Sequence, residues 1–485
     1  MRTQQIWIFF KSSSIIATAS LILPTMVSKI TLSIAAVGAV LAWWFASGNK
    51  LHKNVCDSES LVLTRPWFFS SPATLDDTTI GDTTTLPVIT VDPCHVFSDT
   101  YQEARALFRQ AAVDAGCELH ALQVYENYTI DIAVLTGTLP GLTVHASGVH
   151  GVEGYAGSAV QIAFLEAIPK PVKLELPTLI FVHAFNPVGM AHYRRTNEHN
   201  VDLNRNALTQ LEWQTYATDH YNRANYERFD SYLFNPARAP TLMSSAVEFW
   251  VRAVIALQHH GLQTLKAAMV GGQYHQPRGI FYGGTELEPS TRLVEDFIKE
   301  YLSQHEELST QTVTWMDVHT GLGTFGEDTM MTRPESSIWP DKDPAKEFSE
   351  WFPDSHSPYD AASATAADVV KGYQQIKGIT ADYFEGLFTA DQKPLLTIQE
   401  FGTKPNILVG HALVIENMAH HYSGPDEALQ WARRTTRRAF YPDSALWRRQ
   451  VLERGLRALC QATKRSSQLS NQQSEQPVPD KANVE

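Results

Sequence analysis

Cysteine is scarce in this 485-residue chain, which holds only four, at scattered positions. Four thiols cannot build a disulfide framework, and their spacing does not suit a four-thiolate zinc site. Basic residues are also in the minority, since 39 Lys and Arg stand against 52 Asp and Glu, for a net charge of −13. A negative field of this size disfavours nucleic acid or anionic lipid as the main partner.

Two catalytic signatures are missing as well. The sequence has neither the Gly-x-Ser-x-Gly elbow of serine hydrolases nor the His-Glu-x-x-His helix of zincin proteases. Its composition is that of an ordinary globular protein, with 44% hydrophobic and 19% charged residues. This excludes a mainly disordered, collagen-like or polytopic membrane protein.

A long uncharged run lies near the N-terminus, from Ile30 to Ala46, and ends in Trp43-Trp44-Phe45. It approaches the roughly 20 apolar residues that a membrane-spanning helix needs, and aromatic residues suit the interface. The alternative is a cleaved signal peptide, although no small-residue cleavage site follows the run. We therefore expect residues 1–50 to hold a retained, single-pass membrane anchor. Basic residues on both sides leave its orientation open, while a glycosylation sequon at Asn127 favours a luminal or extracellular catalytic domain.

The rest of the chain divides by composition into three parts. Residues 51–95, rich in Thr, Asp, Ser and Pro, are predicted to be a linker, and residues 464–485, rich in Ser, Gln and Pro, a disordered tail. Between them, residues 96–463 alternate strand-like and helix-like stretches, which predicts one α/β domain. The strand-like runs include 128–136, 142–146, 178–184, 313–318 and 395–400.

Residues able to bind a metal follow two of these runs. His150-Gly151-Val152-Glu153 comes after 142–146, and His319 comes after 313–318. Active sites of α/β folds collect at the carboxyl ends of strands, and catalytic zinc takes three protein ligands, often His₂Glu, plus a water. A His-x-x-Glu pair alone is weak evidence, because most such pairs are surface turns with two unrelated polar residues.

Three further motifs follow in order: Asn186-Pro187-Val188-Gly189, Tyr193-Arg194-Arg195-Thr196-Asn197, and Asp202-Leu203-Asn204-Arg205-Asn206. Together with the His-x-x-Glu pair and His319, this ordered set resembles the zinc carboxypeptidases of the carboxypeptidase A type, over residues 96–455. Within that superfamily the chain is most similar to an uncharacterised branch known only as a domain of unknown function. The resemblance implies a mixed, mostly parallel twisted sheet flanked by helices.

The resemblance also implies a metal centre. His150, Glu153 and His319 would hold one Zn²⁺ per chain. Asp202 would accept a hydrogen bond from the far nitrogen of His150 and so fix that ring. Bound zinc would activate a water molecule for hydrolysis.

Two more matches would carry the chemistry. Glu400, in Thr397-Ile398-Gln399-Glu400, would be the general base and acid; the alternative is a buried structural carboxylate. Arg194 would stabilise the oxyanion, with its neighbour Arg195 read as a surface or salt-bridge residue. Asp317, two residues before His319, is equally consistent with a structural strand-end acid.

The substrate-binding matches are Asn204 and Arg205, which would clamp a terminal carboxylate, for which a guanidinium fork is suited. Tyr373 is the best candidate for the mobile tyrosine that covers this carboxylate in the family, with Tyr383 as the runner-up. Residues 206–292 look longer than the family core requires, and such insertions usually shape substrate access.

We therefore predict a zinc metallocarboxypeptidase that acts on a peptide with a free carboxylate. The nearest alternative is a deacylase of N-acyl amino acids that uses the same metal site. An alternative from a different class is a catalytically inactive, membrane-tethered binding module, which the retention of all three ligands, Glu400 and Arg194 disfavours.

Overall fold

The structure is a computed structural model, and it divides the chain into two compact units. One comprises Met1–Lys53 and Thr241–Gly261, and the other Asn54–Pro240 and Leu262–Glu485. The described residues are 61–64, 88–168, 175–216, 225–241, 243–333, 336–357, 376–424 and 427–474. In the first unit they form the π-helical turn η4 (Ser244–Glu248) and helix α9 (Phe249–His260). The second unit holds the sheets and the candidate site.

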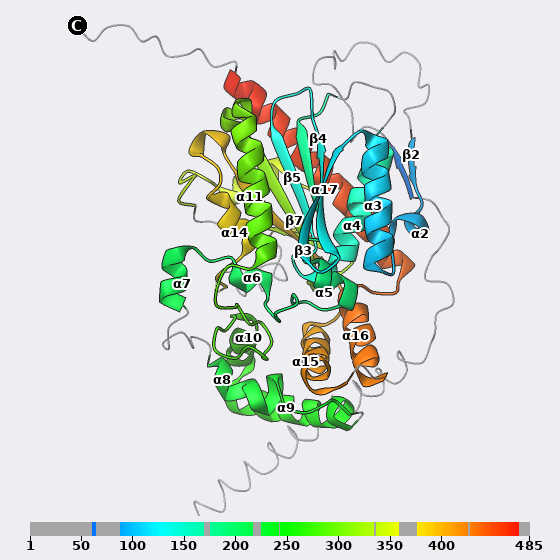
Figure 1. Cartoon of the computed structure of the whole chain (residues 1–485), viewed down its shortest axis with the longest axis vertical. Helices are drawn as coiled ribbons and strands as arrows, with labels where there is room; N and C mark the ends of the chain where they lie inside the picture. The colour runs from blue at the N-terminus through cyan, green and yellow to red at the C-terminus, as the bar shows by residue number, and fades with distance from the viewer. Residues whose placement is uncertain are drawn as a thin grey trace, which may run out of the picture. The chain divides into compact units, whose positions relative to one another are not determined.

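The second unit is built on a seven-stranded sheet with the order β3-β4-β6-β5-β7-β9-β8 (Figure 1). Pairs β5–β6, β5–β7 and β7–β9 are parallel, whereas β3–β4, β4–β6 and β8–β9 are antiparallel. The sheet is therefore mixed, as predicted, with three parallel and three antiparallel pairs. Its strands are β3 (Glu118–Tyr125), β4 (Tyr128–Leu135), β5 (Leu142–Ser147), β6 (Thr178–His183), β7 (Val313–Phe325), β8 (Asp328–Met331) and β9 (Leu395–Gly402).

The remaining elements of this unit are helices, short helical turns and one small sheet. The helices are α2 (Pro93–Val96), α3 (Tyr101–Ala115), α4 (Gly154–Ala167), α5 (Pro187–His192), α6 (Leu203–Asn206), α7 (Gln210–Tyr216), α8 (Tyr226–Phe229), α10 (Leu262–Val270), α11 (Pro289–Gln304), α12 (Pro344–Trp351), α14 (Thr380–Glu385), α15 (Asn406–Tyr422), α16 (Glu427–Phe440) and α17 (Ala445–Ser474). The short turns are η2 (Gly151–Glu153), η3 (Asp230–Phe234), η5 (Glu306–Thr310) and η6 (Ala390–Gln392). Strands β1 (Leu61–Thr64) and β2 (Val88–Val91) pair antiparallel in a separate two-stranded sheet.

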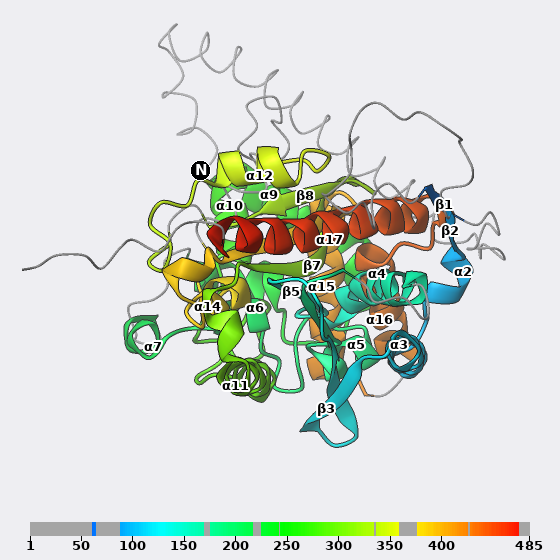
Figure 2. The ribbon, with the colours of Figure 1, turned by 90° about the horizontal axis from the view of Figure 1, so that it is seen from above.

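Helices cover both faces of the large sheet, because alternate residues of its buried strands point to opposite sides. Figure 2 shows α11 and α14 on one face and α3, α4 and α17 on the other. In β5, Leu142 and Val144 belong to the apolar cluster that includes α11 and α14. Thr143 instead contacts Ser466 of α17, and Ser147 contacts α4. Each central strand is thus buried on both faces, which explains its nearly continuous apolar sequence.

The two ends of helix α3 follow from its sequence. Thr100 accepts a hydrogen bond from the Glu103 backbone, and the Glu103 side chain bonds back to the Thr100 backbone. This reciprocal pair satisfies N–H groups that the first helical turn leaves unpaired. The helix ends at Gly116, whose φ of +84° is readily adopted by glycine.

The predicted N-terminal transmembrane helix is corrected. Among the described residues, no helix is both long and apolar enough to cross a membrane. The run Ile30–Ala46 lies outside the described residues. We therefore withdraw the anchor, together with the single-pass membrane localisation and the membrane as a partner.

The C-terminal boundary of the domain also differs from the prediction. Helix α17 continues to Ser474, past the expected start of a disordered tail at Lys464. Arg465 is fully buried and pairs with Glu347 at 2.8 Å, while its Nη1 donates to the Val313 carbonyl. The buried residues of this stretch are largely polar and are held by hydrogen bonds. Its composition therefore resembles that of a disordered tail, although it is a folded helix.

The burial of two histidines leads us to predict that the folded protein loses stability in acid. Burial lowers the pKa of His145 and of His183 to about 3. The folded state therefore keeps both rings neutral, while the unfolded chain gains protons below its ordinary pKa of 6.5. Stability is complete above pH 6.5 and falls as the pH drops toward 3, by about 1.4 kcal/mol per pH unit for each histidine.

Urea unfolding in a metal chelator, followed over this pH range, tests the prediction. His145→Gln should remove one histidine's share of the slope. His259→Gln is the control, because His259 is exposed. Equal slopes for the wild type and His145→Gln would contradict the prediction.

Candidate metal centre

Three ligand-type side chains meet at one edge of the sheet. His150 lies in the turn after β5, Glu153 ends η2, and His319 directly follows the part of β7 that pairs with β5. Because β5 and β7 are parallel neighbours, their carboxyl ends reach the same edge. The three residues are buried, with exposed fractions of 4%, 2% and 1%. The structure therefore brings together the three residues that the sequence singled out as ligands.

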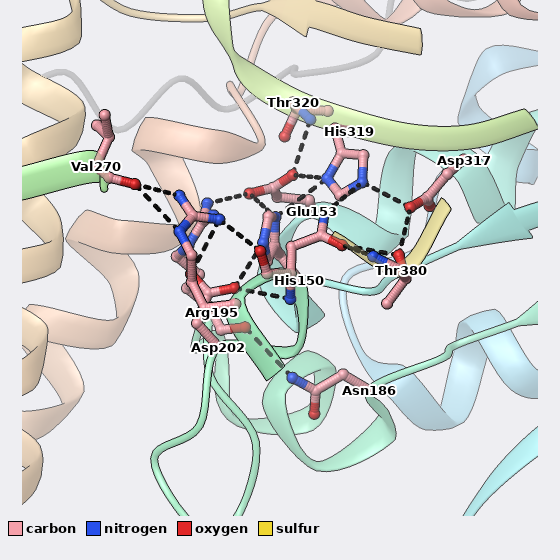
Figure 3. A network of polar contacts seen from close by, with 12 residues as sticks. His150, Glu153, Asn186, Arg195, Asp202, Val270, Asp317, His319, Thr320 and Thr380 are labelled. Carbon is pink, nitrogen blue, oxygen red and sulfur yellow. Dashed lines mark hydrogen bonds and ion pairs between the residues drawn. The ribbon is translucent and has the colours of Figure 1, made fainter. Parts of the chain in front are cut away.

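The distances within this group suit a single metal ion. Nδ1 of His150 and Nδ1 of His319 are 3.1 Å apart, and each lies 3.0 Å from an oxygen of Glu153 (Figure 3). Ligand atoms about 2.0 Å from a tetrahedral ion lie about 3.3 Å from one another. His150, Glu153 and His319 could therefore hold a metal ion, because one ligand atom from each lies within 4.8 Å of the others.

The electrostatics of the group favour a cation. Burial alone would raise the pKa of Glu153, but His150 and His319 outweigh burial and hold it below its usual range. Burial would also lower the pKa of His319, yet Asp317 and Glu153 hold it well above its ordinary value. The carboxylates thus require positive charge at this position. A divalent ion held by neutral imidazoles would supply that charge in place of protons.

Close backbone packing shapes the turn that carries His150. Gly151 approaches Gly189 so closely that a Cβ on it would lie 2.1 Å from the Gly189 carbonyl carbon. Asn186 accepts a hydrogen bond from the Gly189 backbone at 2.9 Å, and its side chain donates to the Arg195 carbonyl. The Asn186-Pro187-Val188-Gly189 motif therefore fixes the loop against which the His150 turn packs.

Each histidine has a carboxylate on its far nitrogen. Nε2 of His150 lies 3.1 Å from Asp202, as the resemblance implied, and Nε2 of His319 lies 2.8 Å from Asp317. Burial would raise the pKa of Asp202, but Arg195 and its other cationic neighbours hold it well below its usual range. The sequence reading left Asp317 undecided, although the Asp-x-His spacing on a strand places both side chains on one face.

Glu400 lies beside the ligands on the neighbouring strand. In the parallel pair β7–β9, Glu400 is the register partner of His319. The backbone N–H of Leu322 donates to its carboxylate at 2.7 Å. Burial, and then the charge of Glu153, raise the pKa of Glu400 to about 7. A carboxyl with this pKa can accept and release a proton near neutral pH.

The two adjacent arginines point in directions that the sequence analysis did not predict. Arg194 is buried and forms an ion pair with Glu416 of α15 at 2.8 Å, away from the ligands. Arg195 instead reaches the centre, since its Nη1 lies 3.1 Å from Glu153 and its Nε lies 2.9 Å from Asp202. The structure thus places the side chain of Arg195, and not that of Arg194, in contact with Glu153.

Asn204 and Arg205 lie next to the centre but are engaged within the protein. The Asn204 oxygen accepts from the backbone and hydroxyl of Thr380, and its nitrogen lies 3.3 Å from Nε2 of His319. The Arg205 guanidinium donates twice to the carbonyl of Val270, at 3.1 and 2.7 Å. Part of the predicted insertion 206–292 therefore packs directly on a predicted substrate-binding residue.

The insertion also brings an aromatic residue to the arginines. The ring centroid of Phe281 lies 4.9 Å from the guanidinium of Arg195 and 5.2 Å from that of Arg205. Phe281 has a φ of +54°, which is uncommon for a bulky residue. No signal in the sequence pointed to this residue.

Neither of the two tyrosines predicted to cover the substrate is seen at the centre in the part of the chain that the structure describes. Tyr373 lies outside this part. Tyr383, the runner-up, donates from its hydroxyl to Glu295 of α11 at 2.9 Å. It also packs against the apolar cluster beneath the sheet.

Comparison with known proteins gives one family and several distant structures. A family model described as "Protein of unknown function (DUF2817)" matches residues 97–454. No curated protein matches the sequence. The structure of bovine thrombin-activatable fibrinolysis inhibitor in complex with tick carboxypeptidase inhibitor is 12% identical, with a TM-score of 0.42, over 78% of this chain and 99% of that chain. The carboxypeptidase A from Helicoverpa armigera is 13% identical, with a TM-score of 0.32, over 70% and 74%.

Proposed function

Since the chain belongs to the DUF2817 family, we propose that it is a zinc-dependent hydrolase that cleaves an amide bond next to a free carboxylate. The family match confirms the expected membership of a family of unknown function, and the ordered motifs support our proposal that this family is a branch of the zinc carboxypeptidases. The substrate we propose is a peptide cleaved at its C-terminal bond.

One observation carries the proposal. A buried His₂Glu ligand set shares one edge of the sheet with Glu400, whose pKa is raised to about 7. A structural metal site is usually closed by four protein ligands, whereas three ligands leave a position for water. A carboxylate beside that position is what hydrolysis requires.

Each residue of the centre has a separate role in the proposed reaction. His150, Glu153 and His319 would hold the zinc ion, which supplies an activated water and polarises the scissile carbonyl. Glu400 accepts a proton from the attacking water and returns it to the leaving amine. Arg195, whose guanidinium is 3.1 Å from Glu153, donates to the carbonyl oxygen as it becomes negative.

Recognition of the substrate carboxylate falls to Arg205 in this proposal. The substrate carboxylate would replace the Val270 carbonyl as the acceptor of the Arg205 guanidinium, whose planar fork matches a carboxylate. Arg205 lies one residue from Asn204, which contacts His319, so a carboxylate bound to it would be close to the reacting bond. Matched substrates test this assignment, because a C-terminal amide keeps the scissile bond and removes the charge.

Metal analysis of the full-length chain tests the proposal first. Elemental mass spectrometry should find about one zinc per wild-type chain and a loss of zinc in His150→Ala and His319→Ala. Folded wild-type protein without zinc after supplementation would overturn the metal site and favour a binding module.

Hydrolysis assays then separate the substrate classes. Blocked dipeptides with a free carboxylate should be cleaved, and their C-terminal amides cleaved far more slowly. Turnover of N-acyl amino acids without turnover of dipeptides would identify a deacylase. Equal rates for acid and amide would contradict a role for Arg205 in carboxylate binding.

A further inference from the structure

Asp317 lies directly behind the ring of His319. The two residues are two apart on β7, so their side chains lie on the same face of the strand. The Asp317 carboxylate lies 2.8 Å from Nε2 of His319, while Nδ1 of the same ring faces Glu153 at 3.0 Å. The ring is therefore held from behind with its other nitrogen toward the ligand group (Figure 3).

Thr380, at the start of α14, ties this carboxylate to a second side chain. Its hydroxyl lies 2.7 Å from the Asn204 oxygen and 3.4 Å from Asp317. Its backbone N–H also donates to the Asn204 oxygen at 3.0 Å. The Asn204 nitrogen lies 3.3 Å from Nε2 of His319. Both atoms are donors when this ring nitrogen donates to Asp317, so Asn204 packs beside the ring without a hydrogen bond to it. The three residues surround the back of the histidine ring.

A purely structural strand-end acid does not explain this arrangement. Asp317 is 1% exposed, and its Oδ1 has no hydrogen-bond partner in the part of the chain that the structure describes. Burying a carboxylate with an unpaired oxygen is costly, so such groups call for a compensating role. Orienting a metal ligand is such a role, because the outer partner of a ligating histidine sets its tautomer and direction.

We propose that Asp317, held by Thr380, is the positioning residue for His319, as Asp202 is for His150. Asn204 then belongs to this network and not to the substrate-binding site. The inference rests on the proposed metal centre. It also goes beyond that proposal. It gives roles to Asp317 and Thr380, which the motif resemblance left without one, and it moves Asn204 from substrate binding to the support of His319.

Zinc affinity of the full-length protein, measured by competition with chelators, is the test. Asp317→Ala should weaken zinc binding by about 10–100-fold, since outer partners of metal-bound histidines have effects of this size. Asp317→Asn keeps the shape but loses the charge, and we expect an intermediate loss. Thr380→Val removes only the hydroxyl and should weaken binding less. With Co²⁺ as a substitute, Asp317→Ala should also change the visible absorption bands, which report ligand geometry.

Asp131→Asn is the matched control, because Asp131 is equally buried but pairs with Arg105 and Arg109 away from the centre. It should lower stability and leave zinc affinity unchanged. If Asp317→Ala does not fold, Asp317→Asn and Thr380→Val decide the question.

Zinc affinity and Co²⁺ spectra equal to the wild type in all three site variants would overturn the positioning role while leaving the metal centre intact. Wild-type protein that binds no zinc would overturn both proposals.

Discussion

Replacing Glu400 with glutamine should lower kcat by about 10²–10⁴-fold, the range that a general base contributes. Glutamine keeps the shape and can still accept the hydrogen bond from the Leu322 backbone, but it cannot take a proton from water. Zinc content should stay at the wild-type level, because Glu400 does not belong to the ligand group. Measuring kcat and zinc per chain on the same samples therefore separates lost chemistry from lost metal.

The pH profile provides a second readout of the same variant. Burial and Glu153 raise the pKa of Glu400 to about 7, and a bound cation lowers it. The base works when it is deprotonated, so the rate should fall as the pH drops through a value at or below about 7. Residual activity of Glu400→Gln should lack this acid limb.

Glu385→Gln is the control for loss of a carboxylate that is partly buried outside the centre. Glu385 pairs with Lys342 at 2.8 Å and takes no part in the ligand group. Its kcat and pH profile should match the wild type. Unchanged kcat in Glu400→Gln would refute the general-base assignment and leave Glu400 as a structural residue.

The three candidate ligands, which the structure brings together, could be singled out from the sequence because their signals are local. His150 and Glu153 share one short turn, and each histidine follows a recognisable buried strand. The pairing of strands β5 and β7 then brings His319 to them across the sheet. The glycine-rich turn and the Asn-Pro-x-Gly motif also lie within short segments. The residues of each segment were therefore sufficient to recognise it from the sequence.

The partners of these residues could not be predicted in the same way. Arg194 is paired with Glu416, and Thr380 contacts Asn204, across long stretches of chain. No local pattern tells which of two adjacent arginines turns to the centre. The same limit applies to Phe281, which an insertion brings to Arg195.

The sheet and its C-terminal helix show a related limit. Buried strands were recognised by their apolar runs, but parallel and antiparallel neighbours bury similar sequences when helices cover both faces. Ser466 of α17 accepts from Thr143 and donates to the Leu142 carbonyl, so a serine-rich segment lies buried against the sheet. Hydrogen bonding between distant segments thus stabilises what composition alone marks as disordered.

The neighbouring arginines supply the second large effect. Arg195→Met should lower kcat by about 10²–10³-fold, as expected for loss of one donor to a developing oxyanion. Arg194→Met should instead leave an unpaired Glu416 carboxylate, buried at 3% exposure, and lower the free energy of unfolding by about 3–5 kcal/mol. Its kcat should change only a few-fold, because Arg194 does not contact the ligand group.

Kinetics and urea unfolding should be measured on both variants. If the arginines have the roles proposed here, Arg195→Met loses activity and Arg194→Met loses stability. Arg195 also contacts Glu153 and Asp202, so zinc content must be measured with each rate. Loss of activity without loss of zinc in Arg195→Met would place its effect on the reacting carbonyl. Loss of zinc in proportion to activity would make Arg195 a support of the ligand Glu153. A rate loss confined to Arg194→Met would restore the assignment made from the sequence, because adjacent residues with equal charge differ here only in where their side chains point.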